Sequence, residues 1–277
     1  MLLTIDRGNT KDKFALFDKQ TLVLDSDSPK WVEYWSSSML FSVTTEDKES
    51  RKDTPKLSFD NDVSLSILSQ FFVDNRYKID NCVFCSVRNQ ETNNNFLQLI
   101  SKYFPSTQLT IQTPLPIKNM YKVKTLGMDR LAAIIGARDL FGNNVLVIDA
   151  GTCLTFDYLD RADCYLGGSI SPGIQMKYES LHNFTDNLPL INNVDQVGLI
   201  GNDTDTAIKS GVINGTIGEI KQMISLYRER FSGIKVVMTG GDSKFIKSFL
   251  DKDVEIEKNL IFRGLKKIFE FNEKNIN

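Results

Sequence analysis

The chain has 277 residues, of which 41% are hydrophobic and 25% are charged, and its formal net charge is −2. This length suits one large domain or two lobes of ordinary size, while the balanced charge gives no electrostatic footprint for a nucleic acid. Acidic and basic residues interrupt the first apolar run, and no apolar run approaches the ~18 residues of a membrane span. We therefore expect a soluble, cytoplasmic protein with no membrane or nucleic-acid partner.

The first part of the chain begins with three expected strands, LLTID, FALFD and TLVLD, within residues 1–25. Residues 42–66 are rich in Ser, Thr, Asp, Lys and Glu, so we expect mostly exposed loop around short elements there. Pro114 and Pro116 break regular structure and mark a lobe boundary, which gives domains 1–117 and 118–277, with a closing helix that could pack back on the first lobe. The other expected elements are a helix over 63–75, a strand over 81–87, a helix over 93–103 and a strand around 108–112.

The second part of the chain repeats the order of strands followed by helices. An apolar stripe predicts a helix over 130–141, and a continuous apolar run predicts a buried strand over 145–148. The further elements are a hairpin over 154–170, a helix after Pro172 and Gly173, a long or broken helix over 203–231, a strand over 235–238 and a closing helix over 261–271. This order indicates an α/β protein built from two related halves.

Two strand ends carry the same motif, LLTIDRGNT at residues 2–10 and VLVIDAGT at residues 145–152. A glycine just past a strand lets backbone amides approach a phosphate, and an aspartate there can hold a metal ion or orient a water. Either copy alone is also typical of a tight turn with an Asx-type hydrogen bond. Two copies about half a chain apart favour nucleotide binding, and the TGGD turn at 239–242 could complete the cradle.

The cysteines and the histidine predict no metal centre. Cys82 and Cys85 form a CxxC, but the surrounding NCVFCSV is typical of a buried strand, in which these positions face opposite sides. No second CxxC completes a zinc site, and His182 is the one histidine of the chain, in a sequence typical of a surface. We therefore interpret the cysteines as structural, in a reduced compartment.

Asp129 is the candidate general base. Phosphoryl transfer to a hydroxyl needs positioning and charge stabilisation, and it benefits from a carboxylate that accepts the hydroxyl proton. Asp129 opens a predicted helix whose positive end favours a charged carboxylate, and Arg130 beside it could bind an anionic group. The alternative is a helix-capping role for Asp129 and a surface ion pair for Arg130.

Another expected helix start, GNDTDTAIKSG, contains Thr204. A capping role for Thr204 or Asp203 competes there with a hydrogen bond from Thr204 to a substrate. Farther along, Gly211, Gly215 and Gly218 share one helix face, although each glycine costs ~1 kcal/mol against alanine. We expect that face to pack closely on another helix, within the subunit or across a dimer.

Together these segments resemble type III pantothenate kinase. The resemblance runs from the N-terminus to about Gly264, and its most specific part is GMDR followed by DAGT and GGSISPG. The matching segments are Asp6–Thr10, Gly127–Arg130, Asp149–Thr152, Gly167–Gly173, Gly201–Thr204 and Thr239–Gly241.

The resemblance implies two ribonuclease-H-like lobes with a nucleotide cleft between them, a homodimer, and ATP-dependent phosphorylation of pantothenate, the first step of coenzyme A synthesis. It implies Asp129 as proton acceptor, magnesium with the ATP, and potassium or ammonium as a monovalent cation at Asp149. The implied ATP contacts are Asp6, Arg7, Gly8, Asn9, Thr10, Lys11, Asp12, Lys13 and Thr152. The implied substrate contacts are Tyr121, Gly127, Met128, Asp129, Arg130 and Thr204.

Several residues depart from the family pattern. Arg7 stands where an apolar residue is common, and the stretch from Tyr121 to Asp129 is one residue short and lacks its usual proline. Asn202 removes a positive charge before Thr204. A non-catalytic nucleotide-binding regulator on the same fold is the alternative function. A third is another small-molecule kinase of the wider sugar kinase, heat-shock chaperone and actin superfamily, in which similar DxGNT turns occur.

Overall fold

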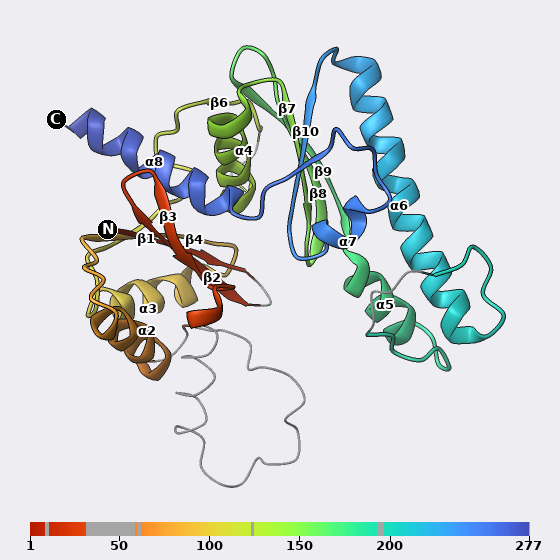
Figure 1. The fold of residues 1–277 in the computed structure, drawn as a ribbon, viewed down its shortest axis with the longest axis horizontal. Helices are drawn as coiled ribbons and strands as arrows, with labels where there is room; N and C mark the ends of the chain where they lie inside the picture. The colour runs from red at the N-terminus through yellow and green to blue at the C-terminus, as the bar shows by residue number, and fades with distance from the viewer. Residues whose placement is uncertain (9–10, 32–58, 60–61, 123–124, 193–196, 277) are drawn as a thin grey trace, which may run out of the picture. The chain divides into compact units, whose positions relative to one another are not determined.

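The computed structural model describes residues 1–8, 11–31, 59, 62–122, 125–192 and 197–276 (Figure 1). They form two compact units. Unit 1 comprises 1–115, 125–132 and 261–277, and unit 2 comprises 116–124 and 133–260. The change of unit at Pro116 lies beside the boundary expected at residue 117, but residues 125–132 and 261–277 belong to unit 1.

Unit 1 is built on a five-stranded sheet. Its order is β3 (Thr21–Asp25), β2 (Asp12–Asp18), β1 (Leu2–Arg7), β4 (Asn81–Ser86) and β5 (Ser106–Gln108). The first three strands are antiparallel, whereas β4 and β5 run parallel to β1. The three expected N-terminal strands and the strand over 81–87 are confirmed. The strand around 108–112 ends earlier than expected, because Thr110 and Thr113 form a turn in which the Thr113 N–H donates to the Thr110 carbonyl at 2.9 Å.

Helices cover both faces of this sheet. On one face α2 (Asp62–Asp74) and α3 (Gln90–Ile100) pack on Phe14 and Leu16. On the other face Phe262 of α8 (Leu260–Ile276) packs on Ala15 and Phe17, the alternate positions of β2. The helix α3 begins before its predicted start because the Asn89 side chain accepts the Thr92 N–H at 2.9 Å and caps the helix.

The expectation of mostly exposed loop around short elements over 42–66 is wrong at Phe59, whereas the expected helix over 63–75 is confirmed as α2. Phe59 and Leu65 are fully buried in the unit 1 core, and residues 62–66 belong to α2. Their apolar side chains fill the sheet face beside Phe14. Most of the remainder, residues 42–58 and 60–61, lies outside the described residues.

Unit 2 repeats the strand order of unit 1. Its sheet runs β11 (Glu255–Ile256), β10 (Lys235–Thr239), β7 (Val145–Ala150), β8 (Cys153–Leu159), β9 (Cys164–Pro172) and β6 (Lys118–Asn119). From β9 to β11 the order and strand directions reproduce those from β3 to β5, and β6 adds an edge strand. The expectation of an α/β protein built from two related halves is therefore confirmed.

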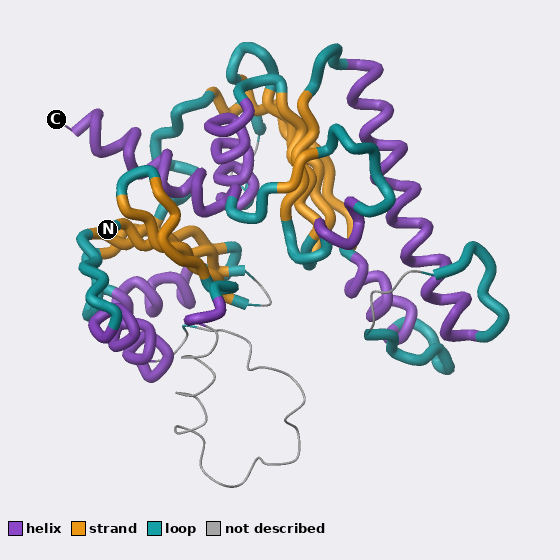
Figure 2. Tube along the Cα trace, in the orientation of Figure 1, coloured by secondary structure: helices purple, strands orange, loops and turns teal. Residues whose placement is uncertain are grey.

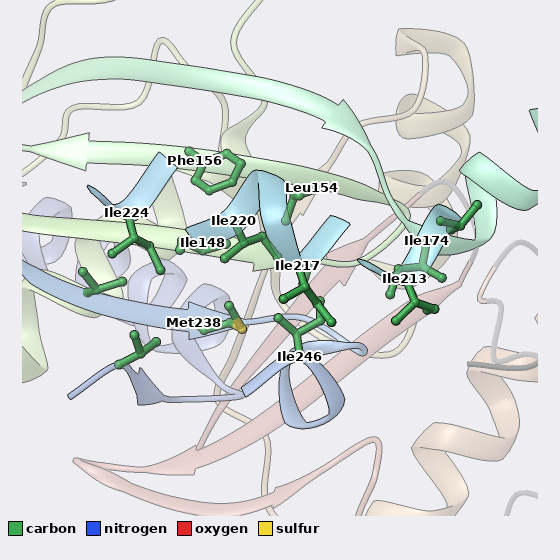
Figure 3. Close-up of a cluster of buried hydrophobic side chains, with 14 of the residues drawn as sticks. Ile148, Leu154, Phe156, Ile174, Ile213, Ile217, Ile220, Ile224, Met238 and Ile246 are labelled. Carbon is green, nitrogen blue, oxygen red and sulfur yellow. The ribbon is translucent and has the colours of Figure 1, made fainter. Parts of the chain in front are cut away.

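The long helix α6 (Thr204–Arg230) is continuous and supplies much of the unit 2 core (Figure 2). Figure 3 shows Ile213, Ile217, Ile220 and Ile224 lying over Ile148 and other buried side chains of the sheet. The other helices that contribute to this unit are α4 (Met128–Phe141), α5 (Ile174–Asn183) and the short α7 (Ser243–Lys247). In the part of the chain that the structure describes, no helix has the length and apolar character needed to cross a membrane.

Candidate active site

In unit 1, Asp6 is the penultimate residue of strand β1 and lies beside a buried thiol. The register pairs Asp6 with Cys85 of β4, and the Cys85 thiol donates to Asp6 Oδ1 across 3.7 Å. Burial raises the pKa of Cys85 well above its usual 9.0, and the negative charges of Asp6 and Asp129 raise it further. Asp6 and Asp129, two of the predicted functional carboxylates, therefore act on the same thiol.

Asp129 lies half-buried in the first turn of α4. Its Oδ1 accepts the backbone N–H of Arg130 at 2.9 Å, one of the N–H groups that a helix leaves without an intrahelical partner. A Cβ on Gly127 would collide with the same oxygen, so only glycine leaves room for this carboxylate. Asp129 is the second residue of the helix, which starts at Met128. It is therefore not the capping residue, which precedes the helix. Arg130 is buried, so the expected alternative of a surface ion pair does not hold.

The first predicted phosphate turn, between β1 and β2, is braced by buried charges. Arg7 and Asp12 are fully buried and face each other in the register, with Arg7 Nε 3.5 Å from Asp12 Oδ1. Lys11 is exposed and Lys13 is half-buried, whereas Asn9 and Thr10 lie outside the described residues. The side chains of Arg7 and Asp12 thus point into unit 1, away from solvent. The inward orientation of Arg7 could have been predicted from the alternation of side chains along a strand, because Leu3, Ile5 and Arg7 fall on one face of β1.

In unit 2, Asp149 is the penultimate residue of β7 and lies against the TGGD turn. The register pairs Asp149 with Thr239, and Gly240 follows with a φ of +93°. A Cβ on Gly240 would collide with Asp149 Oδ1 and the Ala150 carbonyl oxygen, so the two turns converge within this unit as the sequence suggested. Thr152 is exposed in the turn between β7 and β8.

Asp242 of the same turn was missed by the sequence interpretation. Its backbone N–H donates to the Ala150 carbonyl at 3.0 Å, and burial raises the pKa of its carboxyl above the usual 3.8. Asp242 is the last residue of the TGGD motif, so the motif could have indicated it as part of the site. Its burial, however, depends on the pairing of β10 with β7.

Tyr121 lies against the glycine-rich part of β9. Its ring centroid is 6.3 Å from that of Tyr165, and a Cβ on Gly167 would lie 3.1 Å from Tyr121 Cδ2. The φ of Gly167 is +97°, and the Tyr165 hydroxyl donates to buried Asp157 at 2.6 Å. Gly167, Tyr165 and Asp157 therefore hold the surface on which Tyr121 rests, and of these the sequence had indicated only the glycine.

At the start of α6 the capping residue is Asp203. Its carboxylate accepts the Thr206 N–H at 2.8 Å, and the Thr206 hydroxyl accepts the Asp203 N–H at 3.2 Å. This bonding lowers the pKa of Asp203. Of the two capping candidates, Asp203 is confirmed, and Thr204 is the exposed first residue of the helix.

The cysteines of the CxxC lie on strand β4 as expected. Cys82 belongs to the apolar core that α2 and α3 cover, whereas Cys85 faces Asp6 on the other side of the sheet. All four cysteines are free, and His182 is exposed near the end of α5. Among the described residues, no group of three or more His, Cys, Asp or Glu side chains is arranged to hold a metal ion.

The chain is similar to known pantothenate kinases over its length. Residues 2–226 match the model of a family described as type III pantothenate kinase. Proteins of that name from Bacteroides fragilis and Flavobacterium johnsoniae are 33% and 34% identical, over 100% and 99% of this chain and 100% of each relative. One from Christiangramia forsetii is 42% identical over 63% of this chain and 72% of its own length.

A solved structure supports the fold independently. A conserved protein named as a Baf family transcriptional activator from Campylobacter jejuni matches with a TM-score of 0.56 at 23% identity, covering 98% of this chain and 99% of its own. At that identity the likeness concerns the fold alone. The family match and the full-length relatives carry the assignment: the chain belongs to the type III pantothenate kinase family.

Proposed function

We propose that this chain is a kinase that transfers the γ-phosphoryl group of ATP to pantothenate, giving 4′-phosphopantothenate in the first step of coenzyme A biosynthesis. Family membership supports the reaction. The observation that carries its chemistry is the half-buried carboxylate of Asp129 in the first turn of α4, close to the thiol that Asp6 also contacts. Asp6, Asp129 and Asp149 are all present, which a regulator without activity would not need.

Asp129 has the role of general base. The pantothenate hydroxyl oxygen bonds to the γ-phosphorus as the bond to ADP breaks, and Asp129 takes the hydroxyl proton. The bond from the Arg130 N–H to Oδ1 holds the carboxylate in one orientation. The remaining proposed substrate contacts are Tyr121, Gly127, Met128, Arg130 and Thr204.

Residues 6–13 and Thr152 are the proposed ATP contacts. Lys11, Lys13 and Thr152 reach solvent, which supports direct contacts from their side chains. Arg7 and Asp12 are fully buried, so their proposed contribution is to support the turn from inside unit 1. Backbone amides of a glycine-containing turn are suitable donors to phosphate oxygens.

Two cations belong to the proposal. Magnesium accompanies the ATP, where it neutralises charge on the phosphates. Asp149 is the proposed ligand of a monovalent cation, potassium or ammonium, which would add positive charge beside the phosphates. The Asp149 carboxylate and the Ala150 carbonyl, both next to Gly240, are oxygen donors of the kind that potassium prefers.

We also infer a homodimer in the cytoplasm. On α6, nothing described lies within 4 Å of a Cβ built on Gly211, Gly215 or Gly218, so within the described residues the glycine face has no partner in its own subunit. Large apolar side chains, Leu199 and Ile200, are more than 80% exposed in the same unit. The four free cysteines agree with a reducing compartment.

A coupled assay of ADP release tests the function. We expect turnover that depends on pantothenate and is faster in potassium than in sodium, and no turnover with pantothenate in either salt would overturn the proposal. The Asp129→Asn variant keeps the side-chain shape but removes the base, so we expect kcat to fall by about 10²–10⁴-fold.

The matched control is Asp139→Asn. Asp139 is an exposed aspartate in the last turn of the same helix α4. The two variants carry the same change of charge, so an equal loss of kcat in both would remove Asp129 from the role of base while leaving the reaction itself standing.

A further inference from the structure

Three charged side chains of unit 1 form a buried network under the first phosphate turn. Arg88 donates from Nη2 to Asp12 Oδ1 at 3.0 Å and from Nε to the Gly8 carbonyl at 3.1 Å. Arg7 reaches the same Asp12 oxygen, with Nε at 3.5 Å. Arg7 and Asp12 have no exposed surface, and the Arg88 side chain is 16% exposed.

The network fixes all its members. Asp12 Oδ2 accepts the backbone N–H of Phe59 at 2.7 Å, and the Arg7 guanidinium lies 3.8 Å from the ring centroid of Phe96. Burying charges costs free energy that their attraction only partly offsets, so such a network is weak evidence for stability alone. Its better-supported use is to select one conformation of the chain around it.

The conformation in question is the approach of Gly8 to Lys11 and Asp12 between β1 and β2. Gly8 and Asp12 are the two ends of this turn, and a single guanidinium bonds to both of them. A Cβ built on Gly8 would lie 3.1 Å from the Lys11 carbonyl oxygen, so the ends of the turn are already close. Arg88 thus closes the base of the turn that the proposed function assigns to ATP.

Arg88 is itself held in place by other groups of unit 1. It lies two residues after the end of β4. Its backbone N–H donates to Ser86 Oγ at 3.1 Å, and its carbonyl accepts the side chain of Asn93 at 3.0 Å. Asn93 is buried on α3. The guanidinium is therefore presented to the turn by two elements of unit 1, β4 and α3.

We propose that Arg88 is a positioning residue for ATP: it fixes the separation of Gly8 and Asp12, the described residues on either side of the segment that the proposed function assigns to the phosphates. This inference rests on the proposed function. The turn binds phosphate in the ground state and in the transition state alike, so loosening it weakens ATP binding more than it slows the chemical step.

The test is Arg88→Lys. Lysine keeps the charge but lacks the planar guanidinium that donates to two acceptors at once. The variant therefore loses either the bond to Gly8 or the bond to Asp12. We expect the KM for ATP to rise about tenfold, as a small misplacement of a binding group can cost that much or more. The KM for pantothenate should stay constant and kcat should change by less than the KM for ATP.

Arg138→Lys is the matched control. Arg138 pairs with Asp163 in unit 2 through two guanidinium nitrogens, at 2.8 and 2.6 Å, and is half-buried. Its replacement should lower the melting temperature without changing the KM for ATP. An unchanged KM for ATP in Arg88→Lys, or an equal rise in both variants, would overturn the inference.

Two further measurements keep the inference separate from the reaction. The dissociation constant of a non-hydrolysable ATP analogue needs no pantothenate, so a wild-type chain that binds it without turnover would contradict the kinase proposal and still test Arg88. Asp12→Asn retains the side-chain shape and must weaken analogue binding in the same direction. If that variant binds the analogue as tightly as the wild type, the network does not position the turn.

Discussion

Asp242 lies in an environment that disfavours its charge. Burial raises its pKa above 3.8, so the folded state binds the proton more readily than the unfolded state does. Folding stability therefore falls as the pH rises through the interval between the two pKa values. We expect Asp242→Asn to raise the melting temperature at pH 7 and to give little gain at pH 3, as measured by thermal unfolding.

Asp203 affects the pH dependence of folding stability in the opposite direction. Its pKa is lowered by the bond from the Thr206 N–H, so its stabilisation is present above pH 3.8 and is lost as the pH falls through the folded pKa. Asp203→Ala should lower the melting temperature at pH 7, and the loss should shrink in acid. Parallel pH profiles of the two variants would contradict both assignments.

Gly167 is expected to control the position of Tyr121. With a φ of +97° and the Tyr121 ring in contact, Gly167→Ala strains the backbone and displaces the ring. We expect a higher KM for pantothenate and an unchanged KM for ATP. Gly142 has a φ of +81° and no described atom within 4 Å of a Cβ, so Gly142→Ala imposes similar backbone strain without the contact. If both variants change the KM for pantothenate equally, Tyr121 is not the cause.

Among the elements, α6 carries the clearest energetic prediction. Ile220 is fully buried against the sheet of unit 2 (Figure 3), and Ile220→Ala should cost about 2–5 kcal/mol of the free energy of unfolding. Leu226 on the same helix is 48% exposed, so Leu226→Ala should change it by less than about 0.5 kcal/mol. Denaturant unfolding measures both, and similar losses would contradict the packing of α6.

The elements that the sequence predicted well are those with a strong local pattern. The apolar runs of β1 and β7 and the stripes of α2 and α4 were recognisable because burial on a sheet or helix face repeats at a fixed period. The two-residue strands β6 and β11 have no such period. They exist only because a longer strand lies beside them.

In the candidate site, too, local motifs were predictable from the sequence and long-range contacts were not. Local motifs indicated Asp129 and Asp149, since each follows a recognisable strand or opens a helix. The contact of Cys85 with Asp6 and the bonds of Arg88 to the turn depend on how β4 pairs with β1, about 80 residues away. Such pairings across the chain could not be derived from the sequence alone.

At the scale of the whole molecule, unit 1 is discontinuous. Phe262 covers Ala15 and Phe17, and Gly264 packs so closely on the Ala132 carbonyl that a Cβ would collide with it. Lys266 is buried beside Gln20, with Nζ 3.0 Å from Oε1. The predicted lobe 1–117 therefore lacks a helix that covers one face of its sheet.

We expect a fragment of residues 1–117 to fold poorly by itself. Its exposed Phe17 face should bind a hydrophobic dye, and a synthetic peptide of residues 260–276 should suppress that binding and sharpen thermal unfolding. A peptide with Phe262→Ser is the matched control. A fragment that unfolds cooperatively without the peptide would show that α8 is dispensable for unit 1.

The return of α8 to unit 1 has a consequence for synthesis on the ribosome. Domains generally fold as they emerge, N-terminal first, but here the N-terminal sheet waits for residues 261–277 before both its faces are covered. Unit 2 is translated in between and can form its core earlier. A product of translation that stops before α8 would therefore expose the Phe17 face to chaperones and proteases.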